Sequence, residues 1–317
     1  MTLSVESATA RMRKALADQH PDRALAQLDD PGTPPRVDRL RCLSLIYELH
    51  NGKFEHPSWP QHHPVVARWK WLLERQWLDE LAVGDAEHRA QLPSDPIAAM
   101  RALAARDRLP DVYIWTAKHA DQAGIVRFLS LEGGPDAGFD DLVAICQLGL
   151  PVRAKMELAT NYWDEMGNGD LRAVHTTLHE ELGDALQLKS VDDESTLARS
   201  TILGLLATNR ALQPELLGAL GLIELQAGPR SRLVVQGLRR IGAPEEALPF
   251  YEVHAEVDPR HGQGWLDNAI APVLDEYPGI GDRIVRGAMW RSRTNAELFS
   301  GAAVAALMAT SMEGASV

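Results

Sequence analysis

The sequence has 317 residues, of which 45% are hydrophobic and 24% charged, and its formal net charge is -12. This composition predicts a folded chain, long enough for one large domain or two modest ones, and argues against general disorder. Because 44 acidic residues outnumber 32 scattered basic ones, we expect neither nucleic acid nor an anionic membrane surface as the main partner.

The first part of the chain, up to about residue 110, is predicted to be helical. The segments SATARMRKALADQ, HPVVARWKWLLERQWLDELAVG and DPIAAMRALAARDRL repeat apolar residues at spacings of three and four, and breakers such as DDPGTPP and LPSDP separate them. Trp69, Trp71 and Trp77 form a stripe among leucines, which is more typical of a core than of a partner surface. No signal-peptide pattern precedes these segments.

The remaining chain continues the helical pattern in segments such as TLARSTILGLLATN and PELLGALGLIELQAG, and alternating β-branched runs are nearly absent. We therefore predict an all-α protein whose N-terminal helical part, residues 1–110, packs on a C-terminal bundle, residues 111–317. No uncharged stretch is long enough to span a membrane, so a cytoplasmic location is expected. Cys42 and Cys146 have no metal-site spacing and are predicted to be reduced and structural.

The stretch ELATNYWDEMGNGDLRAVHTTLHEEL contains the first candidate ligands, Glu165 and His175. On one straight helix they would point about 80° apart. Residues 167–169, Gly-Asn-Gly, disfavour a helix by about 2 kcal/mol relative to alanine, so a break is expected that turns both side chains toward one centre. His179 is a competing candidate, but its acidic neighbours indicate an exposed edge, and we prefer His175.

Glu224 lies in an otherwise apolar helical run, LLGALGLIELQAG. A carboxylate on such a face is costly to bury unless it is paired or bound to a metal. The alternative is that Glu224 lies at the helix edge and reaches solvent, Arg230 or Arg232.

His254, Asp258 and His261 follow in PFYEVHAEVDPRHGQGW, at spacings that place them within roughly 60° of one another on a helix. Imidazole and carboxylate together suit iron, manganese or zinc. The alternative for these residues is a solvated helix edge. Pro259 lies within the segment and predicts a kink, because its ring clashes with the preceding turn.

Taken in order, these segments resemble the haem-oxygenase-like di-iron oxidases and oxygenases, the iron-containing redox enzyme family. The resemblance rests on NYWDEMGNGD with the following His175, on Glu224, and on the H-x3-D-x2-H pattern that begins at His254. It covers roughly residues 125 to 265. It implies a haem-oxygenase-like helical bundle with additional N-terminal helices, in which three core helices supply ligands to two irons. It also suggests a homodimer.

In this family an early core helix brings a glutamate, and Glu132 in VRFLSLEGGPDAGF resembles it. Many members carry a histidine seven residues later, where this sequence has Phe139, which cannot bind iron. That departure resembles the N-oxygenating branch, in which a later histidine and an extra glutamate, here His175 and Glu165, join the ligand set. For Glu132 the alternative is an acid at a helix end, because glycines and a proline follow it.

The resemblance therefore implies a ligand set of four carboxylates, which balance the charge of two Fe(II) ions, and three imidazoles: Glu132, Glu165, Glu224, Asp258, His175, His254 and His261. The implied chemistry is reduction of O2 through a peroxo-di-Fe(III) species. Because no flavin or nicotinamide fingerprint is present, the electron donor is expected to be external.

The preferred function is N-oxygenation of an amine or guanidine-like nitrogen of a small metabolite in natural-product biosynthesis. Desaturation or carbon-carbon cleavage of an amino acid or fatty acid is the alternative among oxidative enzymes. A helical scaffold that binds no iron is the alternative outside enzymes.

Overall fold

The computed structural model describes residues 6–52, 59–133 and 138–313, and all regular elements in these ranges are helical. The predicted all-α class is therefore confirmed. None of the helices in the described part of the chain combines the length and the apolar character needed to cross a membrane. Cys42 and Cys146 are free and buried, and removal from water raises the pKa of each thiol to about 12.

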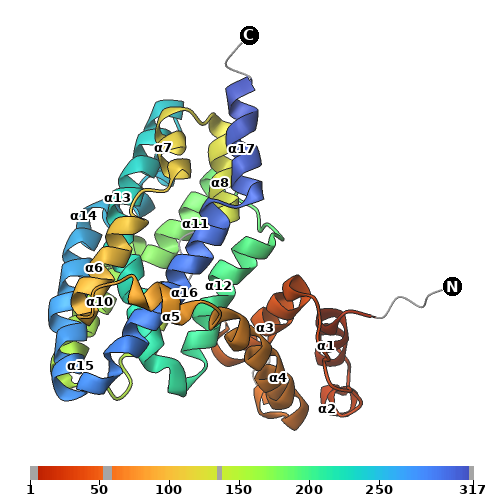
Figure 1. Ribbon diagram of the computed structural model, residues 1–317. Coiled ribbons are helices and arrows are strands. Elements are labelled where there is room, and N and C mark those ends of the chain that lie inside the picture. Colours follow the sequence, from red (N-terminus) through yellow and green to blue (C-terminus); the bar gives the residue numbers. More distant parts are fainter. Residues whose placement is uncertain (1–5, 53–58, 134–137, 314–317) are drawn as a thin grey trace.

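The N-terminal helices are α1 (Ala8–Leu16), α2 (Pro21–Leu25), α3 (Arg36–Asn51), α4 (Pro64–Leu81), α5 (Asp85–Ala90) and α6 (Pro96–Arg106). Helices α1 to α4 lie to one side of the bundle, with α3 against α12 (Glu194–Ala207), whereas α6 packs against α13 (Gln213–Ile241) and α16 (Gly281–Phe299) (Figure 1). In α4, Trp69 and Trp77 are fully buried, whereas Trp71 is 61% exposed. The predicted core stripe is thus correct for two of its three tryptophans.

The bundle is built around the long helix α13, which packs against α7, α14 and α16. Its helices are α7 (Asp111–Lys118), α8 (Gln122–Glu132), α9 (Phe139–Cys146), α10 (Val152–Glu165), α11 (His175–Leu186), α12 (Glu194–Ala207), α13 (Gln213–Ile241), α14 (Pro249–Gly264), α15 (Ala271–Glu276), α16 (Gly281–Phe299) and α17 (Ala302–Glu313). Short helical turns are η1 (Trp59–His62), η2 (Gly167–Gly169), η3 (Leu171–Ala173), η4 (Arg210–Leu212), η5 (Glu245–Ala247), η6 (Trp265–Ile270) and η7 (Pro278–Ile280).

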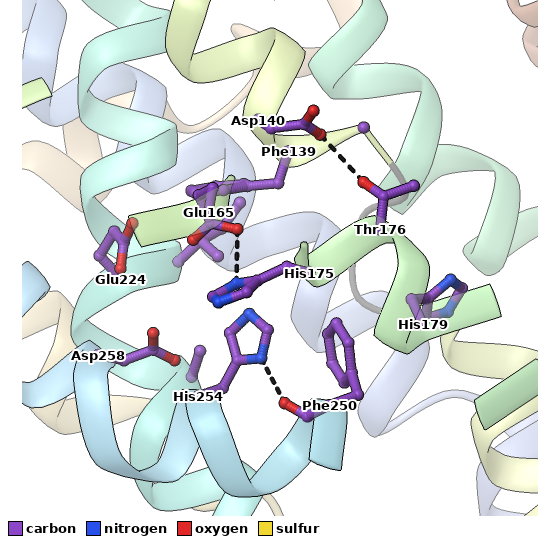
Figure 2. A pocket seen from close by; sticks show the side chains of 13 residues that line it. Phe139, Asp140, Glu165, His175, Thr176, His179, Glu224, Phe250, His254 and Asp258 are labelled. Carbon is purple, nitrogen blue, oxygen red and sulfur yellow. Dashed lines mark hydrogen bonds and ion pairs between the residues drawn. The ribbon is translucent and has the colours of Figure 1, made fainter. Parts of the chain in front are cut away.

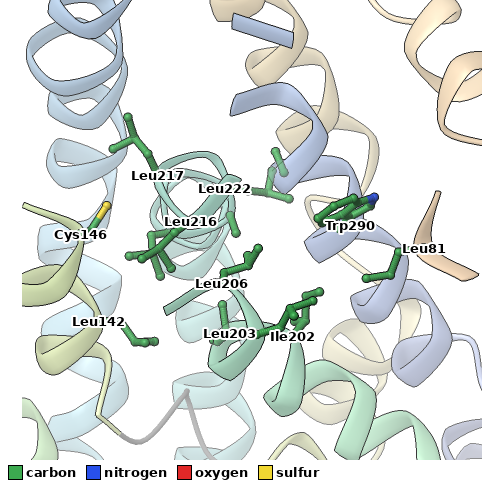
Figure 3. Packing of buried hydrophobic residues seen from close by; sticks show 14 of the residues in the cluster. Leu81, Leu142, Cys146, Ile202, Leu203, Leu206, Leu216, Leu217, Leu222 and Trp290 are labelled. Carbon is green, nitrogen blue, oxygen red and sulfur yellow. The ribbon is translucent and has the colours of Figure 1, made fainter. Parts of the chain in front are cut away.

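One hydrophobic cluster runs through both parts of the chain. Figure 3 shows Leu206 of α12, Leu216 of α13 and Trp290 of α16 within it, and Leu43 of α3 belongs to the same cluster. Burial of these side chains stabilises the fold by roughly 1.5 to 3 kcal/mol for each large apolar residue. Because this core is shared, the division near residue 110 stays a prediction.

Glycines allow α13 and α14 to lie unusually close together. A Cβ atom on Gly262 would be 3.0 Å from the carbonyl oxygen of Glu224, and one on Gly228 would be 3.0 Å from Cδ of Pro259. Helix α14 continues through Pro259 to Gly264, so the proline does not end the helix. This close packing brings Glu224 of α13 to the ligand-bearing face of α14.

Replacement of Gly262 by valine is expected to destabilise the protein by about 1 to 3 kcal/mol, because the added methyl groups must separate the two helices. The same separation should weaken Fe(II) binding. Thermal unfolding and anaerobic Fe(II) titration measure the two effects. Gly183→Ala in α11 is the control, since no atom lies within 4 Å of the added Cβ, and it should stabilise the helix slightly. Unchanged stability in the Gly262 variant would contradict the packing argument.

Candidate metal centre

A tight reversal between α10 and α11 places the first two candidate ligands face to face. Helix α10 ends at Glu165 and α11 begins at His175. All three residues of η2 have positive φ angles, 61°, 54° and 89°, and a Cβ on Gly167 would lie 2.5 Å from the carbonyl carbon of Ala173. As a result, Nδ1 of His175 is 2.7 Å from Oε2 of Glu165. The break predicted at residues 167–169 is confirmed.

Helices α13 and α14 bring four further candidates to the same place, and Figure 2 shows three of them, Glu224, His254 and Asp258. Nδ1 of His261 is 3.6 Å from Oε2 of Glu224 and 3.8 Å from Oδ1 of Asp258. The ring centroid of His254 lies 4.5 Å from that of His175. Six of the seven predicted ligands are therefore clustered between α10, α11, α13 and α14.

The three carboxylates of this cluster are buried beside a pocket whose described lining carries no lysine or arginine. Glu165, Glu224 and Asp258 are only 2% to 3% exposed, and neither lysine nor arginine is among the described lining residues. Burial, followed by the charges of Glu224 and Glu165, raises the pKa of Asp258 well above its ordinary value. Its Oδ2 atom has no hydrogen-bond partner. Such an arrangement is costly unless a cation occupies it, so these residues fit a metal site.

The histidines have one ring nitrogen held by the protein and the other directed at the cluster. Nδ1 of His254 is 2.6 Å from the carbonyl oxygen of Phe250, which leaves Nε2 for a metal. The packed protein around this imidazole lowers the pKa of His254 to about 4, which keeps the ring neutral. Nε2 of His261 is 2.9 Å from Oδ2 of Asp164, and its Nδ1 faces Oε2 of Glu224 at 3.6 Å.

The protonation of His261 differs from that of His254. Burial alone would lower the pKa of His261, but the hydrogen bond and charge of Glu224, together with the bond to Asp164, raise it to about 9. In the metal-free protein this imidazole is therefore a cation at neutral pH. A metal that binds at Nδ1 must displace its proton.

Two overlapping sets of ligand atoms are present. Glu165, His175 and His254 form one set, and Glu165, Glu224 and His261 form the other, with the atoms of each set within 4.8 Å of one another. Glu165 is common to both, which suits two neighbouring ions with a carboxylate between them. Oxygen and imidazole ligands without thiolate suit iron, manganese or zinc.

Two supporting residues on α10 were not singled out from the sequence. Nδ2 of Asn161 donates to Oε1 of Glu224 at 2.6 Å, and Oδ2 of Asp164 also accepts from Arg260 at 2.8 Å. Both lie within one turn before Glu165, in the motif NYWDE. The spacing of Asn161, four positions before Glu165 on the same helix face, was the available signal for that residue. Asp164, one position before Glu165, points about 100° away, so the spacing gave no signal for it.

Asp164→Asn is expected to weaken Fe(II) binding roughly 10- to 100-fold, because the charged acceptor that orients the ring of His261 is replaced by a weaker, neutral amide. Asp170→Asn is the matched control, since that side chain is exposed and pairs with Arg172. Anaerobic Fe(II) titration compares the variants. Wild-type affinity in the Asp164 variant would show that the contact does not orient a ligand.

The structure does not bring Glu132 into the cluster. Glu132 is the last residue of α8, where Oε1 accepts the hydroxyl proton of Tyr113 and lies 3.9 Å from Nη2 of Arg199. Like Asp258 it belongs to neither ligand set, but Asp258 lies 3.8 Å from His261, whereas Glu132 lies with Tyr113 and Arg199, so three carboxylates rather than four surround the site. Its geometry matches the alternative of an acid at a helix end, and its role as a ligand stays a prediction.

Glu224 does not pair with Arg230, which was one of the alternatives that the sequence left open. The guanidinium group of Arg230 donates to the backbone carbonyl oxygens of Asp107 and Arg108. The Glu224 carboxylate contacts Asn161 and His261 instead. Glu224 is 3% exposed, so it does not lie at a solvated edge.

His179 lines the pocket but lies beyond Phe250 from the ligand cluster (Figure 2). Its ring meets that of Phe250 edge-on, with centroids 5.4 Å apart. Phe139 lines the same pocket, so an apolar ring stands where many members of the resembled family have a histidine. The preference for His175 over His179 agrees with this geometry.

A protein-family model matches the region that holds the cluster. The family model described as "Iron-containing redox enzyme" matches residues 126–296, which is more than half of the chain. Comparison with curated proteins found no match. The matched region extends from α8 to α16 and includes all six clustered residues.

Proposed function

The chain belongs to the iron-containing redox enzyme family, and from this membership we propose that it is a non-haem di-iron oxygenase that activates O2. The family and the helical arrangement together establish an iron-dependent oxidoreductase class with a haem-oxygenase-like all-α fold. Two irons per chain are supported by the two overlapping ligand sets that share Glu165. Bound iron would supply the electrons and open coordination positions that O2 reduction requires.

The pocket wall favours an amine over a fatty acid as the substrate. Besides the clustered ligands, the pocket is lined by apolar groups of Phe139, Ile223, Ala227 and Phe250, and by Asp140. No lysine or arginine is found among the described lining residues, so no such side chain there pairs with the carboxylate of a fatty acid. A neutral amine needs no counter-charge, and a protonated amine has Asp140 in the pocket wall. This absence of a lining cation is the observation that carries the proposal.

We therefore infer N-oxygenation of an amine or guanidine-like nitrogen. One amine, one O2, two electrons and two protons give one hydroxylamine and one water, and the electrons come from an external reductant. The apolar rings exclude water from the reacting nitrogen, while Asp140, whose Oδ1 accepts from Thr176 at 3.2 Å, favours the approach of a positively charged group. Both effects, exclusion of water and attraction of a positive charge, come from side chains of the protein.

Paired probes of equal chain length test the assignment. The iron-loaded protein is incubated with labelled O2 and ascorbate, and with either hexylamine or hexanoate. We expect the label in a hydroxylamine, nitroso or nitro product of the amine, and no reaction of the acid. Desaturated or chain-shortened products, or turnover of hexanoate alone, would contradict N-oxygenation and favour desaturation or carbon-carbon cleavage.

A further inference from the structure

Helix α10 exposes a row of apolar side chains on the face that points away from the metal centre. Val152, Met156 and Trp163 are 75%, 65% and 53% exposed, and Ala159 between them is exposed as well. Their spacing of four, three and four residues aligns them within about 60° on one side of the helix. We call these four residues the α10 stripe. A contiguous apolar surface with a polar rim is typical of an interaction site.

The opposite face of the same helix carries part of the metal centre. Asn161 and Glu165 are buried there, and Asn161 donates to Glu224. At the edge between the two faces, Oδ2 of Asp164 is 2.9 Å from Nε2 of His261, and the Asp164 side chain is 14% exposed. One helix, about 10 to 12 Å across with its side chains, therefore separates the α10 stripe from the ligand cluster.

Basic side chains border the α10 stripe. Arg153 and Lys155 flank it on α10, and neither forms an ion pair with another described residue. Of the acids on these flanks, Asp164 pairs with Arg260 of α14 at 2.8 Å, and Glu157 accepts a hydrogen bond from η6. The two free cations give this face positive charge on a chain whose net charge is -12. They attract a negatively charged partner to this face, whereas the acidic excess elsewhere disfavours its binding.

We propose that the α10 stripe is the docking surface for an acidic electron-carrier protein that delivers electrons one at a time to the irons. This inference rests on the proposed function, whose reaction needs two electrons from an external reductant. In each encounter the carrier loses one electron and one Fe(III) becomes Fe(II), and no covalent bond forms or breaks. Two encounters restore the two Fe(II) ions that react with O2.

The size of the α10 stripe fits a brief encounter better than a permanent contact between subunits. A helix of 14 residues is about 21 Å long and about 10 Å wide, so its outer face offers on the order of 200 Å². A stable interface buries roughly 800 Å² on each partner, whereas electron-transfer encounters are smaller. A second copy of this chain would need contacts well beyond this face, so we assign the stripe to the electron carrier.

A plant-type two-iron ferredoxin serves as the acidic carrier in the test. Val152→Glu places a charge on the stripe, and Val83→Glu is the matched control, because Val83 is 72% exposed after α4. Arg153→Glu and Arg127→Glu form the corresponding pair for the basic rim, since Arg127 is exposed on α8. The measurements are iron content, sedimentation velocity, and binding of oxidised ferredoxin to the oxidised, iron-loaded protein. Anaerobic reduction of that protein by reduced ferredoxin and by ascorbate is then followed.

We expect wild-type iron content in all four variants. Val152→Glu and Arg153→Glu should each weaken ferredoxin binding and slow reduction by ferredoxin roughly 10-fold, and the effect of Arg153→Glu should shrink at high salt. Reduction by ascorbate, which needs no docking surface, should stay unchanged. Val83→Glu and Arg127→Glu should behave like the wild-type protein in every measurement.

Three outcomes would overturn the inference. The first is absence of ferredoxin binding to the wild-type protein at low salt, or equal binding by Val152→Glu and Val83→Glu. The second is a dimer that Val152→Glu alone converts to monomers, which would make the stripe a contact between two copies of the chain. The third is equal slowing with ferredoxin and ascorbate, which would indicate a disturbed metal centre.

The proposed function is tested separately by O2 consumption with an amine and ascorbate. Its absence, with ferredoxin docking intact, rejects the oxygenase assignment and leaves the docking surface in place. O2 consumption without ferredoxin docking rejects the docking surface alone.

Discussion

Glu165→Gln is expected to reduce Fe(II) binding from about two ions per chain to less than one, with affinity lowered at least roughly 100-fold. Glu165 belongs to both ligand sets, so its carboxylate is the one group whose loss affects both ions. Glutamine keeps the size of the side chain but removes the negative charge. Anaerobic Fe(II) titration measures the effect, and O2 consumption should fall with it.

Glu256→Gln is the control for this variant, because it makes the same chemical change on an exposed residue of α14. It should bind iron like the wild-type protein. If Glu165→Gln loses only one of two ions, Glu165 serves a single ion and does not lie between two. If it retains both with unchanged affinity, the ligand cluster is wrongly assigned.

Asp258→Asn is expected to have opposite effects on the metal-free and iron-loaded proteins. Without metal, a buried carboxylate with an unpartnered oxygen faces two other acids, and its replacement by a neutral amide should stabilise the fold by about 1 to 3 kcal/mol at neutral pH. With iron, the loss of a negative charge beside the ions should weaken binding. Thermal unfolding with and without Fe(II) measures both.

The pH dependence of this difference follows from the raised pKa of Asp258. The folded protein holds the proton of Asp258 more tightly than the unfolded chain does. The stability that this proton contributes to the wild-type protein is therefore present below the ordinary carboxyl pKa, and it is lost as the pH rises through the raised pKa of the folded state. The two metal-free proteins should thus become equally stable as the pH is lowered. Asp275→Asn, on an exposed side chain, should change neither stability nor binding. A metal-free Asp258→Asn protein less stable than wild type at neutral pH would contradict the account.

Features that depend on local sequence were predictable. The helical class follows from apolar spacing, and the reversal before His175 follows from the glycines of η2, which reach left-handed φ angles at little cost. The exposure of Trp71 was also open to prediction. Residues two positions apart on a helix point roughly 200° apart, so Trp69 and Trp71 cannot both face the core.

Features that depend on packing between distant helices were not predictable. Glu132 binds Tyr113 of α7 and lies near Arg199 of α12, and no local pattern shows that these helices surround the end of α8. The kink expected at Pro259 stays a prediction, and no local pattern pairs this proline with Gly228, whose missing side chain leaves room for the proline ring against α13. The contact between Asn161 and Glu224 likewise needs the packing of α10 on α13.

The presence of a two-iron site is tested most directly by an anaerobic Fe(II) titration of the metal-free protein, with the melting temperature recorded at each step. We expect saturation at about two irons per chain and a melting temperature that rises with iron, because a metal that binds only the folded state stabilises it. Absence of iron uptake with an unchanged melting temperature would contradict the claim and favour the helical scaffold.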